Sequence, residues 1–421
     1  MQDPAKSPNL KRLTTLFLAA GLTALTACDD SDDNNSTAPD TEEKVVVSTA
    51  AADFSSGAHA VIGTESPYDA LTELNPDVSN LAVRARGADF FRFNRDTHTV
   101  AKYDIENPET PVWEHSLDDG ANPHDLVFLS DSKAYLLQYQ KDNGLIVDPS
   151  AAEAGQFVTN TTALDLSAYA NDTSSDADGY DAVPQMQSGV VVGDRAYLVM
   201  QRLIDDPEGG FSKIQETAYV AVFDTRTNTE IDTNPNTDGL KGIKLAVRNP
   251  GHIVHDEANN QLVIGAAGDY EPASSDENST SGGVETINLA DTDCSDGSCY
   301  STNQILDDSQ GIGEVMGIAV ADADTAYAIG YKGWGDSGLY AFNPQDGTLE
   351  TENGSPKAIA NLSGTNLGDI AMSPSGKLWV GVGDSNDPGL TVIDPNDHSV
   401  VVERISTTLN PGSIAFTVRE Q

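Results

Sequence analysis

Residues 366–384 are NLGDIAMSPSGKLWVGVGD, and the chain returns to this arrangement at three other places. NPHDLVFLSDSKAYLLQY occupies residues 122–139, NPGHIVHDEANNQLVIGAAGD begins at residue 249, and NPGSIAFTV occupies residues 410–418, close to the end of the chain. Each full copy has a turn with Pro or Gly, a short apolar strand, a polar turn and an alternating strand. The chain is therefore built from repeated β-hairpins, and its last copy contains only half of the repeat.

Two further strands follow each hairpin. The third ends in an Asp turn, as in AYVAVFDTRTN and GLTVIDPNDH, and a fourth, as in SVVVERI, completes the unit. Four short antiparallel strands at a period of roughly 45 to 65 residues predict the blades of a β-propeller. Six blades lie near residues 81–117, 122–170, 184–233, 243–306, 314–362 and 366–407, and we number them 1 to 6 in this order.

The two ends of the chain supply a seventh blade. GSIAFTV (412–418) is an innermost strand without successors, whereas AHAVIGT (58–64) and YDALTELNP (68–76) are later strands without a first. Joining them closes the ring and removes exposed sheet edges. The predicted fold class is an all-β, seven-bladed β-propeller of four-stranded antiparallel blades, with its ring closed by N- and C-terminal strands that share one blade.

The stretch from residue 366 resembles the repeat of YVTN or YncE-like seven-bladed propellers, in which P-x-x-I-A-x-S-P-x-G is followed by L-x-V, V-x-V-I-D and V-V. The resemblance is good over residues 366–416, fair over 122–148 and loose elsewhere. Blade 4 departs most, because it carries long inserts and a pair of cysteines. Such a resemblance supports the architecture much more than a function.

The chain is strongly acidic. It has 23 Lys and Arg against 66 Asp and Glu, a formal net charge of −43 and a pI near 4.1. Nucleic-acid backbones are therefore excluded as partners, and a ligand with positive charge or a bound metal is favoured. The alternative is a solvated acidic surface that keeps an exported protein soluble.

The N-terminus has the features of an export signal. Lys6, Lys11 and Arg12 precede the uncharged stretch LTTLFLAAGLTALTA, which is too short to span a membrane. LTAC (25–28) resembles the lipobox of bacterial lipoproteins, which implies cleavage after residue 27 and diacylation of Cys28. We therefore expect a signal peptide at 1–27, a lipidated cysteine with a disordered acidic tether at 28–44, and the propeller at 45–421.

This arrangement implies a protein of the cell envelope of a Gram-negative-type bacterium, held by lipid. The outer membrane or cell surface is favoured over the periplasmic face of the inner membrane. In such a compartment Cys294 and Cys299, within DCSDGSCY, are expected to form a local disulfide on the face opposite the binding face. A cysteine-pair metal site is the alternative.

Loops from strand 4 to the next strand 1, and from strand 2 to strand 3, emerge on one face of such a propeller. Three long inserts fall in these classes on blades 2 to 4, at residues 169–185, 201–218 and 267–283. We expect them to build a rim beside a central funnel, since inserts gathered on one face usually serve binding. Within the first insert, Asp172, Asp176, Asp178 and Asp181 suggest either a Ca²⁺ loop or a solvated acidic loop.

The blade alignment also places one position of each blade at the mouth of this funnel, just before the first apolar residue of the innermost strand. These positions hold Asn80, Asp125, Ser188, His252, Gly317, Asp369 and Ser413, with His124, Gln187 and Met316 directly before three of them. We select His124, Asp125, Gln187, His252, Met316 and Asp369 as ligand-binding residues, and add Trp334, from a strand 2–3 loop, as a ring for stacking on a flat ligand.

A transition metal is one expectation for this mouth and a hydrated polar floor is the other. His124, His252 and Asp369 are the candidate metal ligands, because neutral imidazole and carboxylate suit Zn²⁺, and Met316 would extend the set to copper. Either arrangement is compatible with a larger ligand resting on the funnel.

Three classes of function remain open. No G-x-S-x-G elbow, P-loop or H-E-x-x-H motif is present, so an enzyme such as a lactonase or metal-dependent hydrolase is disfavoured and is the second alternative. A protein-interaction scaffold of the cell envelope is the first alternative. Propeller lipoproteins of similar plan work beside TonB-dependent receptors and hold corrinoids, haem or siderophores. The resemblance therefore favours capture of a metal chelate of that kind for uptake with an outer-membrane receptor.

Overall fold

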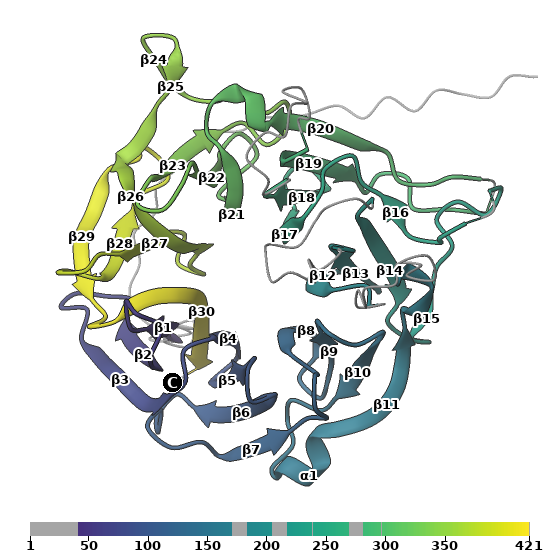
Figure 1. The fold of residues 1–421 in the computed structure, drawn as a ribbon, viewed down its shortest axis with the longest axis horizontal. Helices are drawn as coiled ribbons and strands as arrows, with labels where there is room; N and C mark the ends of the chain where they lie inside the picture. Colours follow the sequence, from purple (N-terminus) through teal and green to yellow (C-terminus); the bar gives the residue numbers. More distant parts are fainter. Residues whose placement is uncertain are drawn as a thin grey trace, which may run out of the picture. The chain divides into compact units, whose positions relative to one another are not determined.

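The protein is a propeller in which seven antiparallel blades follow one another around an axis (Figure 1). The computed structural model describes residues 41–170, 183–203, 217–237, 239–268, 281–295 and 297–420. The first strand of each blade lies nearest the axis, and the later strands lie progressively further out. The predicted fold class is confirmed.

Blades 1 to 4 are separate sheets. Blade 1 contains β4 (Leu81–Arg86), β5 (Asp89–Asn94), β6 (Thr99–Asp104) and β7 (Trp113–Ser116). Blade 2 contains β8 (Pro123–Ser130), β9 (Lys133–Gln138), β10 (Asn143–Val147) and β11 (Val158–Asp165), with helix α1 (Ala154–Phe157) before β11 and the 3₁₀ helix η1 (Ser167–Tyr169) after it. Blade 3 contains β12 (Met186–Val192), β13 (Arg195–Met200) and β14 (Tyr219–Asp224), and both β15 (Thr229–Glu230) and β16 (Ile243–Lys244) pair with β14. Blade 4 contains β17 (Pro250–Asp256), β18 (Gln261–Ala266), β19 (Gly283–Asn288) and β20 (Thr302–Asp307).

Blades 5 and 6 share one long strand. Blade 5 contains β21 (Glu314–Val320), β22 (Ala326–Tyr331), β23 (Ser337–Phe342) and the first part of β26 (Ala358–Met372). The 3₁₀ helix η2 (Asp308–Gln310) precedes β21, and the small hairpin of β24 (Thr351–Glu352) and β25 (Ser355–Pro356) lies between β23 and β26. The second part of β26 is the innermost strand of blade 6, which continues with β27 (Leu378–Gly383), β28 (Gly389–Ile393) and β29 (Val400–Ser406). Blade 7 combines β30 (Asn410–Glu420) with β1 (Thr41–Ala50), β2 (Gly57–Gly63) and β3 (Ala70–Asp77).

The ring closes between the two ends of the described chain. β1 pairs with β2 on one side and with β30 on the other, from Thr41 opposite Glu420 to Ala50 opposite Asn410. The sequence supplied three strands of this blade, and β1 is the fourth. It begins at Thr41, before the predicted start at residue 45. Blade 4 likewise begins at Pro250, because residues 243–244 belong to blade 3.

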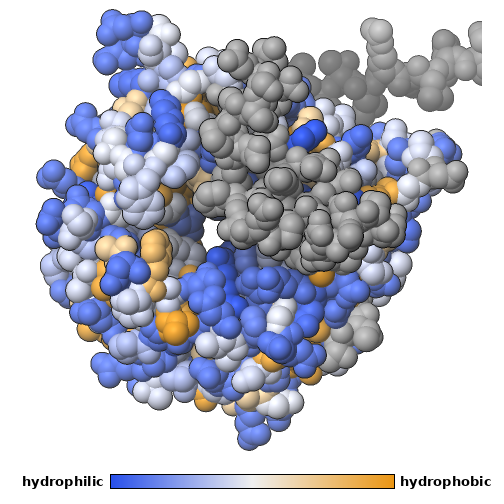
Figure 2. Space-filling model, in the orientation of Figure 1, coloured by the Kyte–Doolittle hydropathy of each residue, from blue (hydrophilic) through white to orange (hydrophobic). Residues whose placement is uncertain are grey.

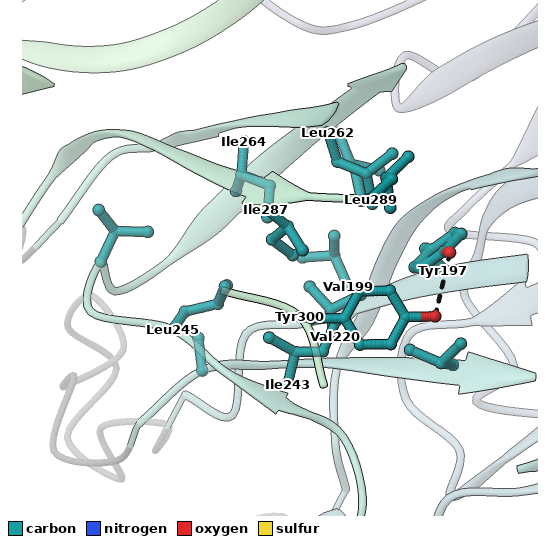
Figure 3. Packing of buried hydrophobic residues seen from close by; sticks show 14 of the residues in the cluster. Tyr197, Val199, Val220, Ile243, Leu245, Leu262, Ile264, Ile287, Leu289 and Tyr300 are labelled. Atoms are coloured by element: carbon teal, nitrogen blue, oxygen red, sulfur yellow. Dashed lines mark hydrogen bonds between the residues drawn. The ribbon is translucent and has the colours of Figure 1, made fainter. Parts of the chain in front are cut away.

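Apolar side chains from facing sheets fill the space between neighbouring blades. Between blades 3 and 4, Val199 and Val220 pack with Leu262, Ile264 and Ile287, all fully buried (Figure 3). Alternation along each strand puts one set of side chains toward each neighbouring blade, so both faces of every sheet are covered. This packing fixes the innermost strands in a ring, and their first residues surround the axis.

The innermost strands share a β-bulge near their first residues. In blades 2 to 5 the register shifts around His124, Gln187, Gly251 and Met316, and in blades 6 and 7 around residues 368–369 and 412–413. Blade 1 pairs without interruption. A bulge bends its strand and re-aims a side chain. In blades 2 to 7 the positions that the repeat alignment placed at the funnel mouth are therefore the bulge residues or those that follow them, and Asn80 of blade 1 is the exception.

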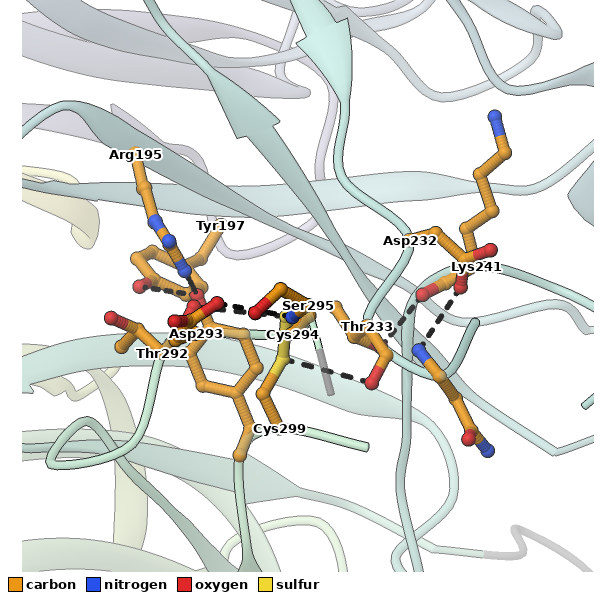
Figure 4. The surroundings of a disulfide bond; sticks show 12 residues. Arg195, Tyr197, Asp232, Thr233, Lys241, Thr292, Asp293, Cys294, Ser295 and Cys299 are labelled. Atoms are coloured by element: carbon orange, nitrogen blue, oxygen red, sulfur yellow. Dashed lines mark hydrogen bonds between the residues drawn. A yellow bond between two sulfur atoms is a disulfide. The ribbon is translucent and has the colours of Figure 1, made fainter. Parts of the chain in front are cut away.

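Cys294 and Cys299 form the predicted disulfide, in the segment between β19 and β20 (Figure 4). Cys299 is buried, and its backbone N–H donates to the carbonyl of Thr233, 3.1 Å away, in blade 3. Next to it, the Tyr300 hydroxyl contacts the hydroxyl of Tyr197 and accepts from Arg195. The disulfide segment therefore also joins blade 4 to blade 3.

Among the described residues, no helix is long and apolar enough to cross a membrane.

Candidate functional site

Two of the predicted site residues hold neighbouring blades together. Asp125 accepts hydrogen bonds from the backbone of Leu126 in its own strand (2.8 Å) and of Gly189 in blade 3 (2.9 Å). Asp369 does the same with Ile370 (2.8 Å) and with Ile414 of blade 7 (3.0 Å). Each carboxylate thus satisfies the irregular backbone of its own bulge and bridges to the next blade.

Ser413 makes the equivalent bridge between blades 7 and 1, because its hydroxyl accepts a hydrogen bond from the backbone N–H of Val83 at 2.8 Å. Asn80, in contrast, bonds the exposed Asp96, because blade 1 has no bulge to bring it inward. Ser188 is buried, and its hydroxyl has no partner among the described residues. The ring of predicted positions is therefore partly a set of clamps between blades.

An arginine pair lies at the axis, and the sequence reasoning missed it. Arg84, on β4, donates from Nε to Asp125 at 2.6 Å. Burial alone would lower the pKa of Arg84, but the carboxylates of Asp125 and Asp369 outweigh it and raise that pKa. Burial and then the positive charge of Arg84 lower the pKa of Arg95 to about 10, so the two guanidinium groups lie close enough to repel.

Arg95 directly follows β5, and its Nε is buried without a hydrogen-bond partner among the described residues. An unpaired buried N–H of this kind costs about 1–3 kcal/mol. The signal that could have found both residues is local: LAVRAR and FNR place cations beside an innermost strand of a very acidic chain. The axis therefore offers donors to an anion.

His124 stacks on Tyr139, with ring centroids 4.2 Å apart and an interplanar angle of 17°. Its Nδ1 lies 2.8 Å from Oε1 of Gln187, the predicted neighbour in blade 3. Burial first, and then the charge of Arg95, hold the pKa of His124 well below its ordinary value, so the ring is neutral. Because an amide oxygen only accepts, Nδ1 carries the proton and Nε2 presents a lone pair, which no described residue occupies.

His252 belongs to the same group. Burial lowers its pKa, while the charge of Asp369 and a hydrogen bond to the Met316 carbonyl act in the opposite direction. Arg84 and Asp125 also act on His252 electrostatically, which places it within their range. We call the axial cluster the set of Arg84, Arg95, His124, Asp125, His252 and Asp369.

A chain of hydrogen bonds extends from this cluster around the face. Tyr139 donates to Gln201 (2.6 Å), and Gln201 donates to Asn249 (2.7 Å), so blades 2, 3 and 4 are joined. Arg95, Tyr139 and Gln201 each directly follow the second strand of their blade. The sequence alignment used the start of the innermost strand only, and so it missed this second ring of positions.

Met316 and Trp334 differ from the prediction. Met316 is a bulge residue, but its side chain packs against the apolar core between blades 5 and 6, which leaves its carbonyl to His252. Trp334 lies in the predicted loop between β22 and β23 and is exposed. It lines a groove that contains no residue of the axial cluster, so it does not flank that cluster.

The described residues contain no group of three or more His, Cys, Asp or Glu side chains that could hold a metal ion. His124, His252 and Asp369 therefore do not form such a group, since the oxygens of Asp369 are bonded to the backbone. Asp172, Asp176, Asp178 and Asp181, and most of the three inserts, lie outside the described residues, as does Cys28. Figure 2 shows that hydrophilic residues dominate one side of the ring and border a hollow near its centre.

The fold resembles solved structures of several proteins. A proposed 6-phosphogluconolactonase from Bacteroides fragilis NCTC 9343 is 14% identical with a TM-score of 0.56, covering 92% of this chain and 100% of that one. The periplasmic gluconolactonase PpgL of Pseudomonas aeruginosa is 12% identical with a TM-score of 0.56, covering 90% and 99%. Apo AztD from Citrobacter koseri is 13% identical with a TM-score of 0.50, covering 90% and 98%.

No protein-family model and no curated protein matches the chain. The three solved structures establish a propeller-type fold, and at this identity they establish nothing further. Membership of the YncE-like family stays a prediction.

Proposed function

We propose that this chain is a capture protein of the cell envelope that binds a metal chelate with at least one anionic group at the ring axis. The observation that carries the proposal is the axial cluster, which joins two guanidinium groups to a neutral imidazole with an available lone pair. Haem, corrinoids and siderophores are the ligand class, since they combine a metal with carboxylate, phosphate or other acidic groups.

The arginines would bind the acidic group of such a ligand. Arg95 has an arginine neighbour and a buried Nε without a partner among the described residues, so an anion would both complete its hydrogen bonds and relieve the repulsion. The net charge of the chain predicts a cationic ligand, and within the axial cluster the two arginines are matched in number by Asp125 and Asp369. We favour an anionic group because these carboxylates are bonded to backbone N–H groups, and Asp125 also to Arg84, whereas Nε of Arg95 has no partner among the described residues.

His124 would bind the metal of the chelate. A neutral imidazole is a common ligand of iron and cobalt, and a hydrogen bond on its other nitrogen orients it. Gln187 makes that bond, and Tyr139 fixes the plane of the ring by stacking. His252 also donates one ring N–H, to the Met316 carbonyl, but no aromatic ring of a described residue stacks on it as Tyr139 does on His124.

Export, the lipid on Cys28 and a TonB-dependent receptor as partner are also part of the proposal. Cys28→Ala should abolish lipid labelling and release the protein from membranes; a variant that stays labelled would remove the anchor from the proposal.

Calorimetric titration with haemin and hydroxocobalamin tests the binding site. Wild type should bind at least one of them, and Arg95→Met should weaken binding by about tenfold or more because one charge-assisted contact is lost. Arg95→Lys keeps the charge and is the matched control, with a smaller loss. The proposal fails if neither chelate binds wild type, or if Arg95→Met binds as tightly as wild type.

A second candidate is hydrolysis of a sugar lactone. The named activities of PpgL and the Bacteroides fragilis protein motivate it, and the supporting observation is the imidazole of His252 beside Asp369 and Arg84. Proton release from gluconolactone measures it. Capture predicts no acceleration above the background rate, whereas an acceleration that disappears in His252→Gln would favour the lactonase.

A further inference from the structure

A groove of about 590 Å³ lies between the loop that joins β1 to β2 and the loop that joins β22 to β23. This volume is in the range of small-molecule sites. The loops belong to blades 7 and 5, so the groove spans blade 6. None of its lining residues belongs to the axial cluster, and nothing in the proposed function uses it.

Two exposed aromatic side chains form its walls. Phe54 is 61% exposed and Trp334 is 74% exposed, and their ring centroids are 6.5 Å apart with an interplanar angle of 63°. Most aromatic side chains of this size are largely buried, so two that meet in solvent from blades that are not neighbours indicate a contact surface.

Hydrogen bonds stabilise both loops that carry these rings. The backbone N–H of Gly335 donates to Oδ1 of Asn366 at 2.7 Å, which ties the Trp334 loop to the start of the innermost strand of blade 6. Phe54 has a φ of 56°, the left-handed conformation that other turn residues of this chain, such as Tyr68 and Tyr300, also adopt. Its turn is closed by hydrogen bonds from Ser55 to the Asp53 carboxylate.

The floor of the groove is neutral and polar. It consists of the first residues of three innermost strands, with Asn80, Asn366 and Asn410 as their amides and hydroxyls from Ser48, Thr49 and Ser79 nearby. Among the described residues that line the groove, Asp96 is the only one with an ionisable side chain, although the chain has 66 acidic residues. This described lining lacks the cations that an anionic ligand needs and the several carboxylates that a polycation needs.

We propose that this groove binds a neutral sugar ring, alone or within an oligosaccharide. A pyranose presents an apolar face of C–H bonds, which suits the face of Trp334 and the edge of Phe54. Its hydroxyl groups both donate and accept, as amide and hydroxyl side chains do. A neutral polyol therefore matches the walls and the floor together, because its hydroxyl groups can bond the amide atoms that Asp96 and Gly335 do not already occupy.

Tryptophan fluorescence is a direct test, because Trp113 and Trp379 are buried and Trp334 is the exposed one of the three. Glucose, galactose, N-acetylglucosamine and their β-1,4-linked disaccharides should shift the emission of wild type and receive saturation transfer in NMR at millimolar concentration. Glucuronate should bind more weakly than glucose, because Asp96 repels it and no cation offsets that repulsion.

Trp334→Ala and Phe54→Ala should each weaken sugar binding, measured by saturation transfer, by about tenfold, as expected when an aromatic contact is lost. Val112→Ala removes another exposed apolar side chain, just before β7 on the outer edge of blade 1, and should change nothing. Absence of any signal with wild type, or equal binding by both aromatic variants and wild type, would overturn the proposal. Chelate binding by Arg95 variants is a separate readout, so failure of one site does not imply failure of the other.

Discussion

Asp125 and Asp369 make the same set of backbone bonds in two different blades. Each accepts from the residue that follows it and from the next blade, and Ser413 makes the second of these bonds with a hydroxyl. Their positions at the axis could be predicted from the repeat, because the repeat fixes the register. Their role could not, because the number of N–H groups around a carboxylate depends on the neighbouring blade.

Arg84 and Arg95 show the opposite case. Their role as anion-binding groups follows from the chemistry of arginine, but their position at the axis was not predicted. Arg84 is the fourth residue of β4 and Arg95 lies beyond β5, so neither occupies the aligned position. The net charge of −43 also led to the prediction of a ligand with positive charge or a bound metal. A total charge averages over the surface and does not describe a site where a few side chains converge.

At the scale of one buried residue, we predict that His59 makes stability depend on pH. His59 Nε2 donates to the carbonyl of Pro108 (2.8 Å), and Nδ1 accepts from Arg92 (3.2 Å), so the ring must be neutral. Burial and the Arg92 charge lower its pKa from 6.5 to about 4. Above pH 6.5 the His59 ring is neutral in both the folded and the unfolded protein. Below pH 6.5 the ring binds a proton in the unfolded protein but not in the folded one, so the free energy of unfolding falls until about pH 4.

This shift corresponds to a loss of about 3 kcal/mol across that window. Urea unfolding at pH 7 and pH 4.5 should therefore show a smaller loss in the free energy of unfolding for His59→Gln than for wild type. Other groups that titrate in this range are present in both proteins and cancel in the comparison. Equal losses in the two proteins would show that His59 has no such role.

At the scale of elements, blade 7 explains how the chain ends meet. The apolar run VVVSTA of β1 is clear in the sequence, but Thr41 to Lys44 were assigned to the tether because they are polar and charged. They pair with β30 all the same, because backbone hydrogen bonds of an added strand need no apolar side chains at its exposed end. Composition therefore placed the start of the propeller at residue 45, but it identified neither this strand nor its first residues.

Two glycines beside the groove give a matched prediction. A Cβ on Gly368 would lie 2.4 Å from the carbonyl oxygen of Pro411, where the innermost strands of blades 6 and 7 meet, whereas a Cβ on Gly383 would find its nearest atom at 3.4 Å. Gly368→Ala should cost about 1–3 kcal/mol, as overpacking does, and Gly383→Ala should cost less than about 1 kcal/mol. Urea melts of the two variants measure the difference, and similar midpoints would contradict the close approach.

The disulfide gives a second prediction at this scale. Cys294 and Cys299 are five residues apart, so the loop-entropy model gives about 2 kcal/mol of stabilisation. The double change to Ser should lower the free energy of unfolding by that amount or slightly more, because Cys299 is buried against blade 3. Reduction of wild type should give a similar loss. A loss near zero in both experiments would show that the bridge does not contribute to the folded state.

At the scale of the whole molecule, the excess of acidic side chains predicts a salt effect. Self-repulsion destabilises a compact state with a net charge of −43, and salt screens it. The melting temperature should therefore rise when NaCl is added to a low-salt buffer. Calorimetric scans measure this. A melting temperature that falls with added NaCl would indicate that attractive ion pairs outweigh the repulsion.

The fold was more predictable than the ligand for a physical reason. A propeller needs only four short strands per repeat with apolar alternation, and that pattern is present in every blade. The ligand depends on which few side chains converge at the axis or on the face, and these come from positions such as Arg95, Tyr139 and Phe54 that the repeat does not constrain. The paired walls of the groove come from blades 5 and 7, whose contact no local pattern specifies.

The most direct test of the account is the absorbance spectrum of haemin titrated with the purified propeller. Coordination by the lone pair of His124 should change the spectrum saturably in wild type and in His252→Ala, and His124→Ala should leave the spectrum close to that of free haemin. A wild-type protein that leaves the spectra of both haemin and hydroxocobalamin unchanged, or a His124→Ala variant that changes the haemin spectrum as wild type does, would contradict the assignment of the axial cluster.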